Sequence, residues 1–327
     1  MKKNITTLLL TLLTTPLFSE TYHSKNTIFR IENDADIRTD MAYTYGADLS
    51  FLFKREDVKD THLAIPFVKN FSQSDKYISF SYAQQMYTPK EIKESELIED
   101  DRPYAGYMYL QTGLYQSFNN VLDSLIFQVG LVGPCVQMDN IQSVIHNVLG
   151  SEHPQGWDHQ IKNELILQVN YSHKQLYNLD QKIASNTALI TNYGFELGNA
   201  STKLFSGAMF RYGYDALKDY GSFVMDNTNY SHIPVKNVIY TNDDTLHFSF
   251  HLMIQADIVA RNIFLDGNTF RDSHSVDKNI FLLEGSYGIS LFYNQWSFDY
   301  VRKHKTKEFK KQYYDTSYGS VLLSYHY

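Results

Sequence analysis

Apolar and polar residues alternate strictly over the stretch TLHFSFHLMIQADI, residues 245–258. One face of an extended chain here would carry only apolar side chains: Leu246, Phe248, Phe250, Leu252, Ile254, Ala256 and Ile258. The other face would be polar except at Met253. This period of two residues predicts a β-strand. The same period recurs at 78–82, 165–171 and 296–300.

Alternating segments of about ten residues or more, separated by polar turns, are typical of a transmembrane β-barrel. We expect about twelve strands, near residues 26–35, 40–54, 76–88, 105–118, 121–133, 162–176, 182–198, 202–215, 244–262, 278–290, 292–303 and 314–327. An even number lets the barrel close antiparallel with both termini on the periplasmic side. The long connections alternate between the two rims less regularly than in a perfect barrel, which indicates at least one misplaced boundary. A soluble β-sandwich is the alternative, but it does not explain the strand length.

The aromatic composition also favours a membrane. The chain has 26 Tyr and 21 Phe but only two Trp. A tyrosine ring can lie among acyl chains while its hydroxyl stays hydrated. In the last expected strand, Val321, Leu323, Tyr325 and the terminal Tyr327 share one face. An outer-membrane barrel that exposes this face to lipid is therefore the predicted fold class.

Targeting and charge narrow the class further. Residues 1–19 place two lysines before an apolar stretch and end at Ser19, which predicts a secretory signal peptide. No linker divides residues 20–327, so we expect one barrel domain. Separately, we expect the protein to be a monomer. The net charge of −7 has no basic block, which argues against nucleic acid as a partner. The single cysteine, Cys135, excludes an intrachain disulfide framework and a thiolate metal cluster.

One stretch breaks the strand pattern. In IQSVIHNVLG, residues 141–150, apolar residues recur at the helical spacing i, i+3, i+4, i+7 and i+8. Asp139 and Gln142 could form a capping box, and Gly150 is placed to end the helix. Gln142 and His146 are four residues apart and share one edge of the apolar stripe. The sequence therefore predicts a short helix in a loop, with its stripe toward the barrel wall or the lipid.

Several blocks of the chain resemble the outer-membrane lipid A 3′-O-deacylase family. They are END at 32–34, YTYG at 43–46, AQQMYTP at 83–89, DDRPYAG at 100–106, and GLVGP at 130–134 followed by QMDNIQSVIHNVLGSE and GWDHQIKNE. These blocks occur in the family's order and cover residues 26–164. The rest of the chain agrees with the family only as a strand pattern.

The resemblance implies a barrel of twelve strands with its active site between the wall and a loop helix near the outer leaflet. It implies Ca²⁺-dependent hydrolysis of the ester-linked 3′ acyl chains of lipid A, with lipopolysaccharide and outer-membrane lipids as partners. The family's functional residues fall on His146, Gln142, Glu152, Asn33, Asp34 and Thr44. Its active-site lysine falls on Lys90 or on Lys93, and the spacing does not fix which.

The chemistry of these residues suits the implied reaction. A histidine can take a proton from water near neutral pH, and a calcium ion can stabilise charge on the carbonyl oxygen. Calcium binds carboxylate, amide and hydroxyl oxygens, as Mg²⁺ does with stricter geometry. We expect His146 as the general base and Asp34 as the main metal ligand. Glu152 would be a further ligand or would orient the imidazole.

Structural roles compete with these functional ones. Asn33 and Asp34 in isolation are turn formers, and Thr44 is first a strand residue. In DDRPYAG, Arg102 is expected to pair with Asp100 or Asp101. Gly106 would permit close packing in the same block.

Two other functions remain open on the residues alone. A serine phospholipase would need a Ser near a His, but Ser143 lies about 60° around the helix from His146. The adjacent pair His23-Ser24 lies at the start of the mature chain. A passive porin or structural barrel would explain every strand and none of the loop motifs.

Overall fold

The computed structural model describes residues 22–34, 41–55, 65, 68, 74–180, 187–214, 219–222, 224–225, 232–235 and 245–327. The expected signal peptide, residues 1–19, lies outside these residues. Among the described residues, no helix has the length and apolar character that a membrane span requires.

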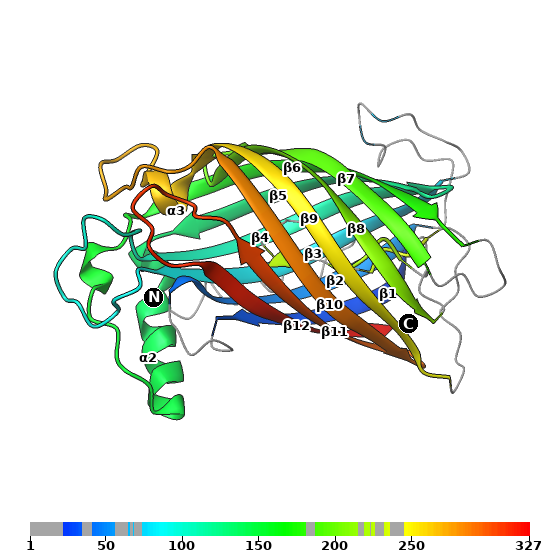
Figure 1. Cartoon of the computed structure of the whole chain (residues 1–327), viewed down its shortest axis with the longest axis horizontal. Coiled ribbons are helices and arrows are strands. Elements are labelled where there is room, and N and C mark those ends of the chain that lie inside the picture. The colour runs from blue at the N-terminus through cyan, green and yellow to red at the C-terminus, as the bar shows by residue number, and fades with distance from the viewer. Residues whose placement is uncertain are drawn as a thin grey trace.

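Twelve antiparallel strands close into a barrel, in which each strand pairs with its neighbours in sequence and β1 pairs with β12 (Figure 1). The strands are β1 (Tyr22–Asn33), β2 (Ala42–Arg55), β3 (Asp75–Thr88), β4 (Ala105–Phe118), β5 (Val121–Val132), β6 (Glu164–Asn178), β7 (Thr187–Gly198), β8 (Ser201–Tyr214), β9 (His247–Asn262), β10 (Phe281–Tyr293), β11 (Trp296–Lys305) and β12 (Thr316–His326). The predicted fold class is confirmed.

The boundaries agree with the sequence pattern to within a few residues. The turn between β10 and β11 was expected near residue 291. In the structure it lies between Tyr293 and Trp296, where Asn294 has a φ of 51°. This hairpin turn contains neither Gly nor Pro, so the pattern placed it too early. At least one expected boundary was therefore misplaced, as the uneven placement of the long connections indicated.

Exposure along β9 alternates as its sequence pattern predicts. Leu252 is 62% exposed on the outside, whereas His251 and Met253 are 4% and 6% exposed on the inside. The outer face of the barrel is therefore apolar and the lumen is lined largely by polar side chains, as expected for strands that face lipid.

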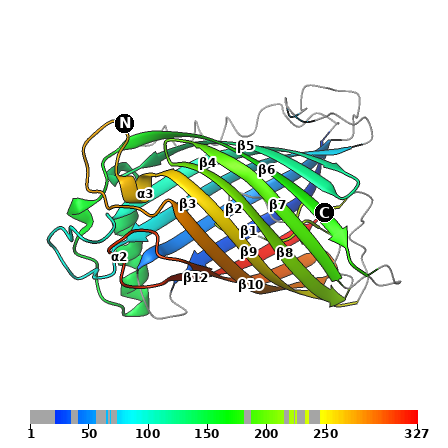
Figure 2. The same cartoon turned by 45° about the horizontal axis from the view of Figure 1, so that its top comes forward.

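The helices among the described residues lie together at one rim, which we call the helix rim (Figures 1 and 2). They are the α-helices α2 (Met138–Leu149) and α3 (Ile263–Asp266) and the 3₁₀ turns η3 (Pro134–Val136) and η4 (Trp157–His159). β1 begins and β12 ends at the opposite rim, which we call the terminus rim.

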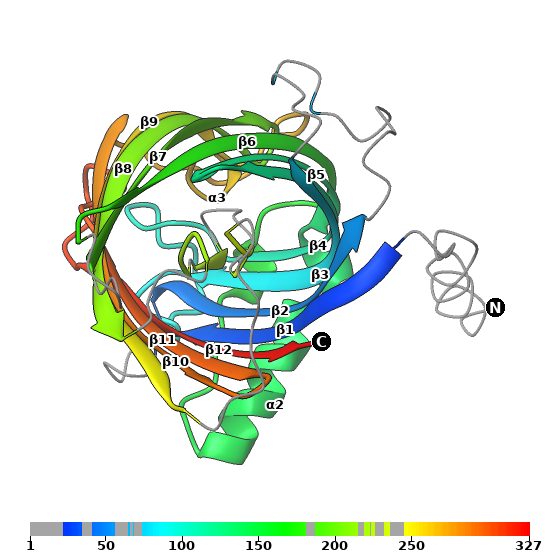
Figure 3. The ribbon, with the colours of Figure 1, turned by 90° about the vertical axis from the view of Figure 1, so that its right-hand side faces the viewer.

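Part of the connection between β8 and β9 lies inside the barrel. We call its described residues, 219–222, 224–225 and 232–235, the lumen segment; Figure 3 looks into the barrel from the terminus rim and shows it within the ring of strands. Asp219 pairs with Arg211 at 2.8 Å, and His232 contacts Asp299 at 2.7 Å. The Tyr220 hydroxyl donates to the backbone oxygen of Val121 at 3.1 Å. Charged and polar contacts therefore hold this segment against the wall.

Candidate active site

Helix α2 begins and ends on left-handed residues. Its N-cap is Gln137, with a φ of 60° and no side-chain cap hydrogen bond. The expected capping box between Asp139 and Gln142 is therefore wrong, because both residues lie inside the helix. Gly150, with a φ of 67°, ends the helix as predicted, and its N–H donates to the carbonyl of His146.

The polar edge of α2, and not its apolar stripe, faces the protein. Gln142 is 1% exposed and His146 is 3% exposed, whereas Val144 and Val148 are 62% and 81% exposed. The helix comes close to β4 at Gly106, where a Cβ atom would lie 2.7 Å from Cγ of Met138. Val144 and Val148 of the stripe therefore point away from the wall, whereas Ile141 packs against it. The prediction that Gly106 permits close packing is confirmed.

His146 is oriented by a backbone carbonyl. Its Nδ1 atom hydrogen-bonds the carbonyl oxygen of Glu152. A carbonyl oxygen can only accept, so Nδ1 carries a proton, and in the neutral ring Nε2 has the lone pair. This is the tautomer that a general base at Nε2 requires.

Gln142 is fixed by a residue that the sequence analysis did not select. Nε1 of Trp157 donates to Oε1 of Gln142 at 2.8 Å. The Trp157 ring lies 4.8 Å from that of Tyr104, centroid to centroid. Among the described contacts, Nε2 of Gln142 is buried without a hydrogen-bond partner. The chain has only two Trp residues, and the place of this one within the GWDHQ block was the signal that could have identified it.

Asn33 is the last residue of β1 and lies on the outer face of the barrel. Phe29 and Ile31 are exposed, so strand alternation places Asn33 on the same outer face. It is opposite Tyr45 in the register of β1 and β2. Tyr45 and Ile141 of α2 both pack against one buried cluster that contains Met86, Met138 and Trp157. This cluster joins the wall to the helix.

Thr44 lies where the register of β2 and β3 shifts, between Tyr43 and Tyr45. Such a bulge redirects a side chain and is common beside active sites. Oγ1 of Thr44 hydrogen-bonds Oγ1 of Thr88 at 2.7 Å. Thr88, in the AQQMYTP block, is a second residue that the sequence analysis missed.

Asp34 follows β1 directly and is 1% exposed. Its Oδ2 accepts a hydrogen bond from the backbone N–H of Met41 at 2.6 Å. This contact ties the two ends of the β1–β2 connection together. Asp34 therefore has a structural contact of the kind that its turn-forming chemistry suggests.

The two candidate lysines have different partners. Lys93 forms an ion pair with the carboxylate of Glu152, and both side chains are largely exposed. Nζ of Lys90 lies 4.4 Å from the centroid of the Tyr313 ring. Lys93 is thus the lysine that the described contacts bring to the His146–Glu152 part of the site.

The DDRPYAG block holds the rim loops together. Arg102 pairs with Glu308 at 2.6 Å, not with Asp100 or Asp101 as expected. The reason is that Asp101 is occupied by the Tyr314 hydroxyl at 2.7 Å and by the backbone N–H of Lys90 at 2.9 Å. Asp100 pairs with Lys311. The block joins two rim connections, those before β4 and before β12.

In the described part of the chain, no three His, Cys, Asp or Glu side chains gather where they could hold a metal ion. The carboxylates of Asp34 and Glu152 each have the partner given above. The oxygen donors at the end of β1 and in the bulge of β2 include the Asp34 carboxylate, the Asn33 amide and the hydroxyls of Thr44 and Thr88. Such donors suit a hard cation and not zinc.

Comparison with known proteins assigns the family. A model of the family described as outer membrane protein LpxR matches residues 5–327. The chain belongs to this family. It is the lipid A 3′-O-deacylase family that the sequence blocks resemble, so that prediction is confirmed, as is the outer membrane as its location.

A family structure shows the same fold. The solved structure of LpxR from Salmonella typhimurium is 18% identical, with a TM-score of 0.73, over 92% of this chain and 100% of that one. The translocator domain of the autotransporter NalP from Neisseria meningitidis matches 98% of this chain and 94% of its own at 9% identity, with a TM-score of 0.41. No curated protein sequence matches significantly.

Proposed function

We propose that this chain hydrolyses the ester-linked 3′ acyl chains of lipid A in the outer leaflet, in a calcium-dependent reaction with His146 as general base. The observation that carries the proposal is the contact between Nδ1 of His146 and the Glu152 carbonyl. With Nδ1 as donor, Nε2 can take a proton from a water molecule that attacks the ester. His146 is 3% exposed, so its ring is held within the protein.

Gln142 supplies a second element. Its Oε1 accepts from Trp157, which turns its Nε2 group into the available donor. A buried amide N–H without a partner can stabilise the negative charge that develops on the ester carbonyl oxygen. We assign Gln142 to this role because Gln142 and His146 lie one helical turn apart on the same buried edge of α2.

Calcium would be held by oxygens at the end of β1 and in the bulge of β2. Asp34 provides the carboxylate, and Asn33 and Thr44 provide neutral oxygens. When bound, the ion would polarise the ester carbonyl. The backbone carbonyl of Glu152 orients His146. The carboxylate of Glu152 pairs with Lys93. This pair would place Lys93 near a lipid A head group.

Two other functions receive less support. The serine alternative would need Ser143 and His146 side by side, whereas they lie about 60° apart around α2. A passive channel would need an open lumen, whereas the lumen segment is bonded to the wall through Asp219, Tyr220 and His232.

Mass spectrometry of lipid A from a host that expresses the wild-type chain tests the proposal. The comparison variants are His146→Ala and Ser143→Ala, each with calcium present or chelated. Loss of the 3′ acyl chains with wild type and Ser143→Ala, only with calcium, supports it. Unchanged lipid A from a folded, inserted wild-type barrel would contradict it.

A further inference from the structure

Three residues in the END and YTYG blocks have no part in the proposed chemistry and face the lumen. Glu32 is 0% exposed and Tyr43 is 4% exposed. Gly46 is opposite Glu32 in the register of β1 and β2. All three are therefore on the inner side of the wall. Asn33 is on its outer side, and so is Thr44, which hydrogen-bonds Thr88 on the face of β3 that carries the exposed Tyr82.

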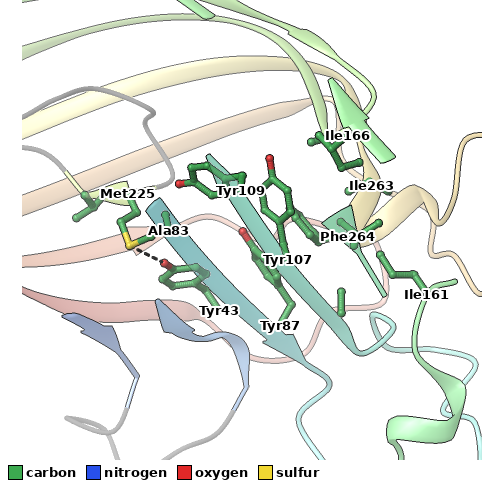
Figure 4. Packing of buried hydrophobic residues seen from close by; sticks show 14 of the residues in the cluster. Tyr43, Ala83, Tyr87, Tyr107, Tyr109, Ile161, Ile166, Met225, Ile263 and Phe264 are labelled. Carbon is green, nitrogen blue, oxygen red and sulfur yellow. Dashed lines mark hydrogen bonds between the residues drawn. The ribbon is translucent and has the colours of Figure 1, made fainter. Parts of the chain in front are cut away.

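These inward residues form a seat for Met225 of the lumen segment. The backbone N–H of Met225 donates to Oε1 of Glu32 at 2.8 Å. The Tyr43 hydroxyl contacts Sδ of Met225 at 3.8 Å (Figure 4). A Cβ atom on Gly46 would lie 2.0 Å from the Tyr43 hydroxyl oxygen and 3.0 Å from Sδ of Met225. A side chain at this position would therefore have to displace the Tyr43 hydroxyl or the Met225 sulfur.

Two residues of the seat are next to residues of the candidate site in the chain. Glu32 precedes Asn33, and Tyr43 precedes Thr44. Successive side chains of a strand point to opposite faces, so an inner side chain that is fixed also fixes its outer neighbour. This matters most at Thr44, because the residues of a bulge are not fully held by the ladder of strand hydrogen bonds.

We propose that Glu32, with Met225 as its partner, is a positioning residue that sets Asn33 and Thr44 on the outer wall from inside the barrel. The inference rests on the proposed function of the outer site. The contact brings the connection that starts and ends at the terminus rim against the wall beside the candidate site. Activity at the outer site then depends on a contact in the lumen that substrate does not reach.

The main test compares Glu32→Leu with Glu32→Gln. The glutamine keeps an oxygen that can accept from the Met225 N–H, whereas leucine does not. With purified lipid A in detergent, Glu32→Leu should lower kcat roughly tenfold or more, since small misplacements of reacting groups are costly. KM should change little, and Glu32→Gln should stay close to wild type. A purely structural role would lower the amount of folded barrel and leave kcat per folded molecule unchanged.

The matched control is Tyr220→Phe. It removes the hydroxyl contacts of the same lumen segment with Val121 and Ser117, away from Glu32. It should keep the wild-type kcat. If Glu32→Leu does not fold, Gly46→Ala tests the seat without changing a charge, and it should lower kcat in the same way.

Amide hydrogen exchange measured by mass spectrometry gives a readout that does not need activity. Exchange of a peptide that covers residues 41–46 should accelerate in Glu32→Leu and not in Tyr220→Phe. An unchanged kcat and exchange in both Glu32→Leu and Gly46→Ala would overturn the inference. So would a loss in Glu32→Gln equal to that in Glu32→Leu, or a loss in Tyr220→Phe. If the wild type itself releases no acyl chain, the proposed function fails and the exchange result alone decides the inference.

Discussion

His146 is bound through its Nδ1 atom to the backbone carbonyl of Glu152, while the carboxylate of the same Glu152 turns to Lys93. One residue thus presents two different groups to two different partners. Its backbone orients the imidazole, and its side chain belongs to an exposed ion pair. The two roles can be separated by mutation.

Glu152→Gln should leave kcat close to wild type because the carbonyl that orients His146 remains. The exposed pair with Lys93 is worth less than about 1 kcal/mol, so stability should change little. His146→Ala should lower kcat on the order of 10²–10⁴-fold, the range of a lost general base. The control is His153→Ala, an exposed histidine one residue after Glu152. A Glu152→Gln loss as large as that of His146→Ala would show that the carboxylate binds metal.

Trp157→Phe should lower kcat by several fold with little change in KM. The ring still packs near Tyr104, but the donor to Gln142 is lost, and a hydrogen bond contributes about 1 kcal/mol. Steady-state hydrolysis of lipid A in detergent measures this. Trp296→Phe alters the other Trp, which is 50% exposed on the barrel exterior, and should have no effect. Equal losses in both variants would contradict the role given to Trp157.

Arg102→Leu should destabilise the rim by about 3–5 kcal/mol, since it leaves the Glu308 carboxylate buried without its partner. Replacing both residues by leucine should recover much of this. The temperature at which the folded barrel loses its faster mobility in SDS gels measures the change. If Arg102→Leu and the double variant unfold at the same temperature, the pair does not act as a unit.

The same pair predicts a pH dependence. Burial alone would raise the pKa of Glu308, but the Arg102 guanidinium outweighs it and lowers that pKa from its ordinary value of 4.5. Glu308 therefore binds a proton more readily in the unfolded chain than in the folded one. Its contribution to the free energy of unfolding is full above pH 4.5 and is lost as the pH falls through the pKa of the folded protein. Acid unfolding should be less steep in Glu308→Gln. Identical acid profiles would contradict this.

Val144→Ser combined with Val148→Ser should reduce activity on lipid vesicles and leave activity in detergent almost unchanged. Both valines are exposed on α2, and a helix with one apolar face lies in the membrane interface. Asn147→Ser, a polar exposed residue on the same helix, is the control. A loss in detergent as large as that in vesicles would show that the stripe serves folding and not lipid contact.

Features that depend on local sequence patterns were predicted better than features that depend on contacts between distant residues. The strand at 245–258 and the end of α2 at Gly150 follow from period and residue type, which are readable in a few neighbouring positions. The start of α2 was wrong because a left-handed Gln137 takes the place of a capping side chain. Left-handed glutamine has no clear signature in sequence.

Contacts between residues that are far apart in the chain could not be predicted from a single sequence. Arg102 and Glu308 are 206 residues apart, and nearer acidic residues competed for the assignment. The same holds for Met225 and Glu32, because the connection that contains Met225 has neither a two-residue nor a helical period. The Gln142–Trp157 hydrogen bond was easier to predict, because the two residues lie in neighbouring blocks.

The arrangement of β9 determines how this chain can fold. In water, closing the strand into a barrel would gather His247, His251, Gln255 and Asp257 in the lumen and leave its leucines and phenylalanines facing the solvent. The hydrophobic effect would then oppose closure instead of driving it. Ring closure and entry into an apolar phase must therefore happen together. In aqueous buffer, the chain therefore has no stable folding intermediate with the shape of the closed barrel.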